Sequence, residues 1–160
     1  MKAKKYRILG IDPGTGITGY GVIDVDGQDY KLVGGGVIRT PSNTDLDKRL
    51  NTIFEELESL IKEYKPTVAS VEKLFFAQNV TTAIAVSHAR GVVLLAANRA
   101  GLELAEYTPL QIKQALTGYG HAKKPQIQEM VRVLLKLANP PKPDDCADAL
   151  AAAICHAMSA

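Results

Sequence analysis

The sequence has no tryptophan, only two cysteines among 160 residues, and no long apolar run. Cys146 and Cys155 are nine positions apart, about two and a half turns of a helix, so they are predicted to point to opposite faces and to stay unpaired. Without a disulfide, a reduced, cytoplasmic compartment is the simplest interpretation. No stretch approaches the roughly 20 apolar residues of a membrane span, and residues 1–7 lack the features of a secretory signal. We therefore expect a cytoplasmic protein that makes no membrane contact.

A strong overall charge is also absent, because 19 basic residues face 17 acids and the net charge is only +2. Hydrophobic residues make up 46% and charged residues 22%, values typical of a globular protein, which excludes disorder and coiled coils. The length suits one domain over residues 1–160. The positive charge is concentrated, however, because residues 109–143 hold six basic residues and one acid, a net of +5. This segment predicts either contact with an anionic partner or a solvated helix face.

The hydrophobic periodicity predicts the element order βββαβαβααα. Short turns join the first three strands into an antiparallel meander, in which three consecutive glycines at 34–36 indicate a bulge or a close backbone approach. The last two strands alternate with helices, which favours parallel pairing. The fold class is therefore α/β, with a mixed five-stranded sheet flanked by helices. The strands are predicted at 6–12, 17–25, 30–39, 67–72 and 102–107, and the helices at 46–64 (with Thr44 as N-cap), 80–100, from 109 onward, 125–137 and 144–158.

Four acids stand where a carboxylate is costly or conspicuous. Asp12 and Glu72 each end an apolar strand, and parallel neighbouring strands would place them at the same edge of the sheet. Asp145 and Asp148 lie three residues apart in the first turn of the last helix and share a face. Asp144 and Asp148 share a face equally well, so spacing leaves this choice open. Each acid alone also has a purely structural explanation. Asp12 suits a turn, Glu72 suits a solvated strand end, and Asp145 and Asp148 suit the positive end of a helix dipole.

Taken together, the four acids predict a metal site. Carboxylates about 4 Å apart repel by roughly 4 kcal/mol at an effective dielectric constant of 20, so such a cluster needs protons or cations. Oxygen ligands favour hard ions such as Mg²⁺ or Mn²⁺. Two such ions about 4 Å apart can activate water and stabilise the leaving oxygen of a phosphodiester. The chemistry expected from the residues is hydrolysis of a phosphodiester bond.

A series of motifs runs along essentially the whole chain: Ile11–Gly14, Thr18–Val22, Val71-Glu72 followed by Phe75, Ala77 and Asn79, then His88–Gly91, Ile112–Gln114 and Asp145–Leu150. In order and spacing they resemble the RuvC family of Holliday-junction resolvases. The resemblance implies a ribonuclease H-like fold and a metal-dependent endonuclease that cuts two opposing strands of a four-way DNA junction in recombination and repair. It also implies that Asp12, Glu72, Asp145 and Asp148 bind the metal, with Asp145 selected over Asp144.

The same resemblance assigns residues to DNA contact. Phe75 matches the aromatic residue that the family places against unpaired bases at the junction centre, where stacking tolerates any sequence. Lys113 and Lys124 match the family's basic contacts and fall in the segment of net charge +5. Lys123 is a neighbour that could substitute for them. Arg90 also matches a family position, although an arginine on an Ala-rich helix could equally brace the fold.

The symmetry of a four-way junction predicts one protein partner, a second copy of the chain, and the family resemblance implies another. A junction offers two equivalent strands and one chain holds one acidic cluster, which predicts a two-fold homodimer. The helix at 80–100 is apolar on more than one face and is the candidate interface, unless it is sandwiched within one chain. The family further implies the RuvA–RuvB branch-migration complex as a partner.

Three rival interpretations stay open. The turn Asp12-Pro-Gly-Thr-Gly16 also suits a nucleotide-binding module of the actin and sugar-kinase kind, but such proteins need two domains to enclose the nucleotide. A junction-binding protein without nuclease activity would gain nothing from four acids, because DNA is a polyanion. A ribonuclease H-like nuclease that acts on RNA is the third.

Overall fold

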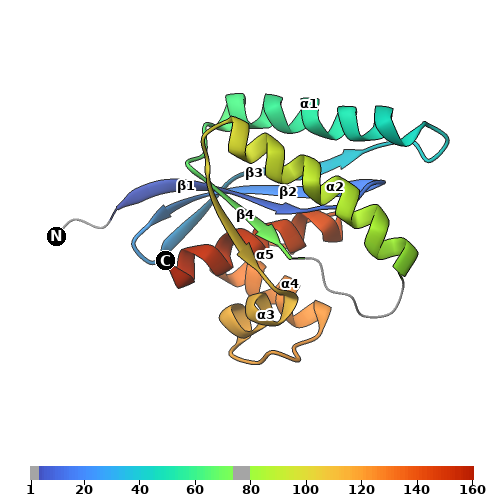
Figure 1. The fold of residues 1–160 in the computed structure, drawn as a ribbon. Helices are drawn as coiled ribbons and strands as arrows, with labels where there is room; N and C mark the ends of the chain where they lie inside the picture. The colour runs from blue at the N-terminus through green and yellow to red at the C-terminus, as the bar shows by residue number, and fades with distance from the viewer. Residues whose placement is uncertain (1–3, 74–79) are drawn as a thin grey trace.

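The computed structural model describes residues 4–73 and 80–160 (Figure 1). Its five strands span Lys5–Asp12 (β1), Ile17–Asp26 (β2), Asp29–Arg39 (β3), Val68–Glu72 (β4) and Glu103–Tyr107 (β5). They form one sheet in the order β3-β2-β1-β4-β5. β1, β2 and β3 are antiparallel neighbours, whereas β4 pairs with β1, and β5 with β4, in parallel. The predicted element order and the mixed sheet are confirmed.

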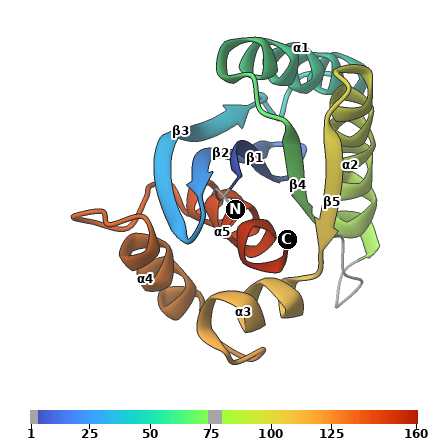
Figure 2. The ribbon, with the colours of Figure 1, turned by 90° about the vertical axis from the view of Figure 1, so that its left-hand side faces the viewer.

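Helices of the described part cover both faces of this sheet. They span Leu46–Tyr64 (α1), Val80–Arg99 (α2), Pro109–Thr117 (α3), Lys124–Leu134 (α4) and Asp144–Ser159 (α5). α1 and α2 lie on one face, and α5 packs against β1 and β2 on the other (Figures 1 and 2). α3 and α4 pack against α5. Each face of the sheet therefore has its own apolar core.

The alternation of side chains along β1 decides which face receives Asp12. Ile8 packs in the core on the α5 side, and Leu9 packs in the core on the α1–α2 side. Because successive side chains of a strand point to opposite faces, Asp12 shares the α5 side with Ile8. β4 follows the same rule: Ser70 donates to a carbonyl oxygen of α5 at 2.7 Å, and Glu72 lies two residues further on. Both strands therefore end in an acid on the α5 side.

Glycines in β1 and β2 let the backbone of α5 approach the sheet closely. A Cβ atom on Gly10 would collide with the carbonyl oxygen of Ala149, and one on Gly19 would collide with that of Asp145. Gly19 is also the residue paired with Asp12 in the register of β1 and β2. The first turn of α5 consequently lies against the end of β1, and this contact carries Asp145 to Asp12.

The element ends differ from the sequence predictions by a few residues. The N-cap position of α1 is Asp45, without a side-chain hydrogen bond, so the prediction of Thr44 was wrong by one residue. α4 ends at 134 where a helix to 137 was predicted, and Lys136 just beyond it has a left-handed backbone with φ of 56°, which is incompatible with a continuing helix. The register of β2 and β3 shifts between Val22 and Ile23, opposite the glycine run. This irregularity in the ladder favours the bulge over the close backbone approach, the other alternative predicted for the glycines.

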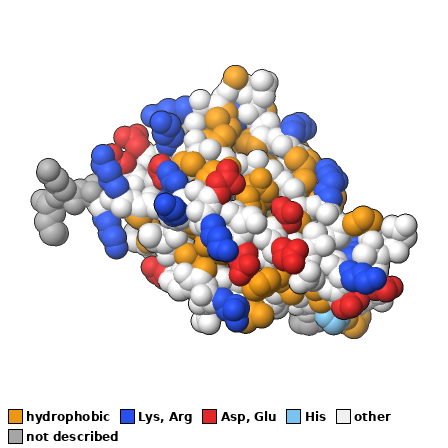
Figure 3. Space-filling model, turned by 90° about the horizontal axis from the view of Figure 1, so that it is seen from above, with side chains coloured by type: hydrophobic (Ala, Val, Ile, Leu, Met, Phe, Trp, Pro, Cys, Tyr) orange, Lys and Arg blue, Asp and Glu red, His pale blue; other side chains and the backbone are white. Residues whose placement is uncertain are grey.

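α2 corrects one expectation drawn from the sequence. By length and composition alone this helix of 20 residues is apolar enough to cross a membrane, so the prediction that the chain has no such run was wrong. Core helices of globular proteins share this length and composition, and here α2 packs against α1 and β5. Figure 3 looks onto the α1–α2 side, where hydrophobic side chains reach the surface among charged ones of both signs.

Candidate active site

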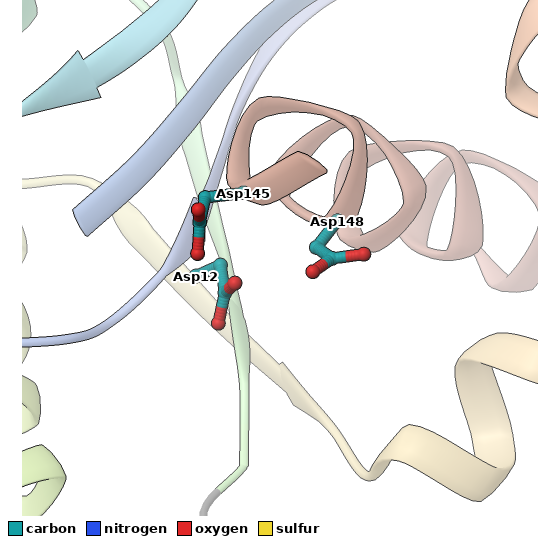
Figure 4. Close-up of side chains that lie close together, drawn as sticks. All are labelled: Asp12, Asp145 and Asp148. Atoms are coloured by element: carbon teal, nitrogen blue, oxygen red, sulfur yellow. The ribbon is translucent and has the colours of Figure 1, made fainter. Parts of the chain in front are cut away.

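Three aspartates meet at the edge of the sheet where β1 ends. Asp12 is the last residue of β1, and Asp145 and Asp148 extend from the first turns of α5 into the same space (Figure 4). Each offers a carboxylate oxygen, and these oxygens lie within 4.8 Å of one another. Spacing left open whether Asp144 or Asp145 joins Asp148, and the structure groups Asp145 with Asp12 and Asp148.

Glu72 lies beside this group, at the end of the neighbouring parallel strand β4. Its carboxyl group is hydrogen-bonded to that of Asp12. Together with Asp148, it also lines a cleft of about 230 Å³ whose other polar side chains are Lys113 and Lys124. The fold thus brings together, in one place, all four acids that the sequence singled out.

Burial and mutual repulsion raise the pKa values of the clustered carboxyl groups. The pKa of Asp12 rises from 3.8 to about 8, chiefly because the group is buried and then because Glu72 and Asp148 are negative neighbours. Burial also raises the pKa of Glu72, against the opposing effects of its hydrogen bond to Asp12 and of the nearby lysines. It raises the pKa of Asp148 as well, although Lys124 opposes the change. Near neutral pH, Asp12 therefore retains its proton unless a cation replaces it.

Lys124, the first residue of α4, places its ammonium group at the rim of the acids. Its Nζ lies 3.6 Å from Oδ2 of Asp148 and 3.9 Å from Oδ2 of Asp144. The negative charge of Asp148, first, and that of Asp144 raise the pKa of Lys124. Because the lysine side chain is 55% exposed, it is also within reach of a phosphate that enters from solution.

The donor set fits a hard divalent cation. Asp12, Asp145 and Asp148 offer only carboxylate oxygens, which suit Mg²⁺ or Mn²⁺ better than softer metals. The raised pKa values agree with this assignment, because they mark a buried site with an excess of negative charge. Such a cation would be held by Asp12, Asp145 and Asp148, with Glu72 adjacent.

The remaining predicted site residues have other surroundings. Arg90 on α2 forms an ion pair of 2.6 Å with Glu106 on β5, and its side chain is only 16% exposed. In this structure Arg90 therefore ties α2 to the sheet. Lys123 is exposed, and its backbone N–H donates to Oε1 of Gln126 at 2.7 Å at the start of α4. Phe75 lies outside the described residues.

Two buried hydroxyl groups near the acids were not identified from the sequence. Thr18 is fully buried, and its Oγ1 donates to the carbonyl oxygen of Gly14 at 2.6 Å and accepts from the Gly14 N–H at 3.3 Å. Ser70, also fully buried, donates to the carbonyl oxygen of Ala152 at 2.7 Å. A polar residue inside an apolar strand is the signal that could have revealed both.

Comparisons with known sequences agree with this geometry. A family model described as crossover junction endodeoxyribonuclease RuvC matches residues 8–156. A relative of that name from Heliobacterium modesticaldum is 59% identical over 152 residues, which cover 95% of this chain and 94% of the relative. One from Rubrobacter xylanophilus is 56% identical over 155 residues, covering 97% and 87% of the two chains.

Solved structures of Holliday-junction resolvases also resemble this chain. Thermus thermophilus RuvC in complex with a Holliday-junction substrate is similar with a TM-score of 0.91 and 37% identity, over 96% of this chain and 94% of that one. The yeast mitochondrial Holliday-junction resolvase is similar with a TM-score of 0.68 over 94% and 78% of the two chains. Its identity is 14%, so this second likeness concerns the fold alone.

Proposed function

The chain belongs to the RuvC family of crossover junction endodeoxyribonucleases, and from this premise we propose which of its residues carry out the reaction. The protein is an endonuclease that resolves Holliday junctions by a metal-dependent mechanism. The observation that carries our assignment is the convergence of carboxyl groups from β1, β4 and α5 on one space. We assign four residues as catalytic and metal-binding: Asp12, Glu72, Asp145 and Asp148.

The acids hold Mg²⁺ or Mn²⁺ in this proposal, with two ions in each active site. When bound, such ions supply the positive charge that activates water and stabilises the leaving oxygen of a phosphodiester. The chain contributes carboxylates in fixed places. Asp12 and Glu72 lie at the ends of paired strands, and Asp145 lies on a helix whose backbone fits against Gly19. This preorganisation supports catalysis because the ligands need little rearrangement when the reaction begins.

Basic side chains bring the DNA backbone to the acids. Lys113 and Lys124 line the same cleft as Glu72 and Asp148, so a phosphate seated there meets positive charge before it meets the carboxylates. Without these lysines, an acidic cluster would repel the polyanion. Lys123 and Phe75 complete the proposed DNA-binding residues, the latter by stacking on unpaired bases. Arg90, the other DNA contact expected from the resemblance, we assign to bracing α2, because its side chain is held in the ion pair with Glu106.

The active form is a homodimer in this proposal, because cutting two opposing strands requires two acidic clusters related by a two-fold axis. α2 supports this, since large apolar side chains on it are exposed: Val80 by 69%, Ile84 by 53% and Leu95 by 53%. We further propose that residues 1–160 act as one nuclease domain, that the RuvA–RuvB complex delivers the junction and that the protein works in the cytoplasm. The single sheet shared by both cores supports the first of these.

The test uses the purified protein with Mg²⁺ and three labelled substrates: a four-way junction, a matched duplex and an RNA–DNA hybrid. We expect paired cuts in the junction and little cleavage of the other two. Asp145→Asn should abolish cleavage and leave junction binding intact, because it removes a metal ligand but weakens the repulsion of phosphate. Ca²⁺ should support binding with little cleavage, since its looser coordination positions water poorly.

Asp144→Asn is the matched control, because it changes the neighbouring acid that lies outside the group of three. It should cleave like the unmodified protein. An inactive Asp144→Asn together with an active Asp145→Asn would mean that the wrong acid has been assigned. Cleavage that persists in EDTA would refute the role of the metal.

A further inference from the structure

A chain of hydrogen bonds surrounds the turn that follows Asp12. Oγ1 of Thr15 donates to the carbonyl oxygen of Ala85 on α2 at 2.5 Å. Oγ1 of Thr40, just after β3, donates to the carbonyl oxygen of Thr15 at 2.5 Å. Nε of Arg49 on α1 then donates to Oγ1 of Thr40 at 2.9 Å. Four segments that are distant in the sequence are thereby joined at the edge where the acids meet.

The turn itself is held at each of its last three residues. Thr18 contacts both the N–H and the carbonyl oxygen of Gly14. Thr40 binds Thr15 through its hydroxyl and Gly16 through its backbone N–H, the latter at 3.0 Å. Thr40 is buried, so its bonds are sheltered from competing water. The backbone path out of Asp12 is therefore strongly restrained.

The hydrogen bond from Thr15 to α2 restrains the turn more than it stabilises the helix. Within an α-helix, the carbonyl oxygen of Ala85 already has a partner in the helix's own hydrogen-bond ladder. The ladder thus survives without Thr15, whereas the turn loses a side-chain link to α2. α2 in turn is anchored to β5 by the ion pair of Arg90 and Glu106, which makes it a firm reference for the turn.

We propose that Thr15 is a positioning residue, whose hydroxyl fixes Asp12 relative to α2, and that Arg49 and Thr40 support it. The inference rests on the proposed catalytic role of Asp12. Its physical basis is that a carboxylate displaced by about 1 Å can lower a rate by as much as 100-fold. A displaced Asp12 would also weaken cation binding, because the distances among the three aspartates would change.

The test compares Thr15→Val, which removes the hydroxyl but keeps the shape, with Thr15→Ser, which keeps the hydroxyl. Thr52→Val is the matched control, since Thr52 is half-buried and its hydroxyl donates to a carbonyl oxygen of its own helix α1 in a bond that is exposed to solvent. Four quantities are measured: the single-turnover cleavage rate of a junction, the junction Kd in Ca²⁺, the Mg²⁺ concentration at half-maximal rate, and the rise in Tm caused by Mg²⁺.

For Thr15→Val we expect a cleavage rate roughly 10- to 100-fold lower and a smaller rise in Tm with Mg²⁺. The Mg²⁺ midpoint should increase severalfold, and the junction Kd should stay unchanged. Thr15→Ser and Thr52→Val should behave like the unmodified protein. If Thr15→Val fails to fold, Arg49→Gln decides instead, with the same changes expected in smaller degree.

The proposal is overturned if Thr15→Val, or Arg49→Gln in its place, keeps the normal rate and Mg²⁺ midpoint. It is also overturned if Thr15→Ser is as impaired as Thr15→Val, because the hydroxyl would then not be the relevant group. Failure of the proposed function looks different. In that case the unmodified protein would not cut junctions, or Asp12→Asn would remain active.

Discussion

Replacing Asp12 by Asn is expected to change how the stability of the cation-free protein depends on pH. The pKa of Asp12 is about 8 in the folded chain and 3.8 ordinarily, so between these values the folded state holds a proton that the unfolded state has released. Such a proton makes the free energy of unfolding fall as pH rises, by up to about 1.4 kcal/mol per pH unit. The stabilisation is complete below the lower value and lost above the higher one. Asn does not titrate, so the variant should lack this slope.

From pH 5 to pH 8 the difference in slope accumulates to roughly 4 kcal/mol, a large part of the stability of an ordinary domain. Urea unfolding in EDTA at several pH values measures it as the change in the free energy of unfolding. The raised pKa values of Glu72 and Asp148 also make the free energy of unfolding fall as pH rises. Burial lowers the pKa of His156, and this shift makes the free energy of unfolding increase with pH. His156 contributes equally to both proteins and cancels, whereas Glu72 and Asp148 interact with Asp12, so the difference measures Asp12 together with its coupling to these two neighbours.

Two further arms make this experiment decisive. Asp144→Asn, which changes an acid outside the group of three, should keep the slope of the unmodified protein. Added Mg²⁺ at 100 times its Kd should stabilise the unmodified protein at pH 8 by about 2.7 kcal/mol and Asp12→Asn far less. Parallel pH curves for the unmodified protein and Asp12→Asn would refute the buried, protonated carboxyl group on which the reasoning depends.

Two other predictions follow from the cleft and from α2. Lys113→Ala and Lys124→Ala should each weaken junction binding and reduce the slope of log K against log salt by about 0.9 for each lost phosphate contact, with exposed Lys142→Ala as the control. An unchanged slope in both variants would place these lysines away from DNA. Sedimentation at micromolar concentration should show a dimer that Ile84→Glu dissociates, because Ile84 is 53% exposed on α2. A monomer that stays monomeric on a junction would contradict paired incision.

The sequence alone predicted the order of the secondary-structure elements, and it singled out four acids that lie close together in the structure. Helical and strand periodicities depend on residues close in the chain, so the element order and the mixed sheet could be predicted without coordinates. Asp12 and Glu72 were recognisable because each ends an apolar strand. The ends of helices were less certain, since caps such as Asp45 depend on details of a single turn.

The assembly of the site depended on tertiary structure. Spacing along α5 allowed either Asp144 or Asp145 beside Asp148, and only the packing of that helix against Gly19 brought Asp145 to Asp12. The raised pKa of Asp12 likewise required burial and neighbours from other elements.

The same holds for contacts between distant segments. The sequence left Arg90 as either a DNA contact or a brace, and the structure shows its ion pair with Glu106 on β5. The hydrogen bond from Thr15 to Ala85 joins residues 70 positions apart, and no local pattern encodes such a pair. Local chemistry thus determined which residues were candidates, whereas the placement of whole elements decided which of them meet, because contact between distant residues exists only once the sheet and its helices have packed.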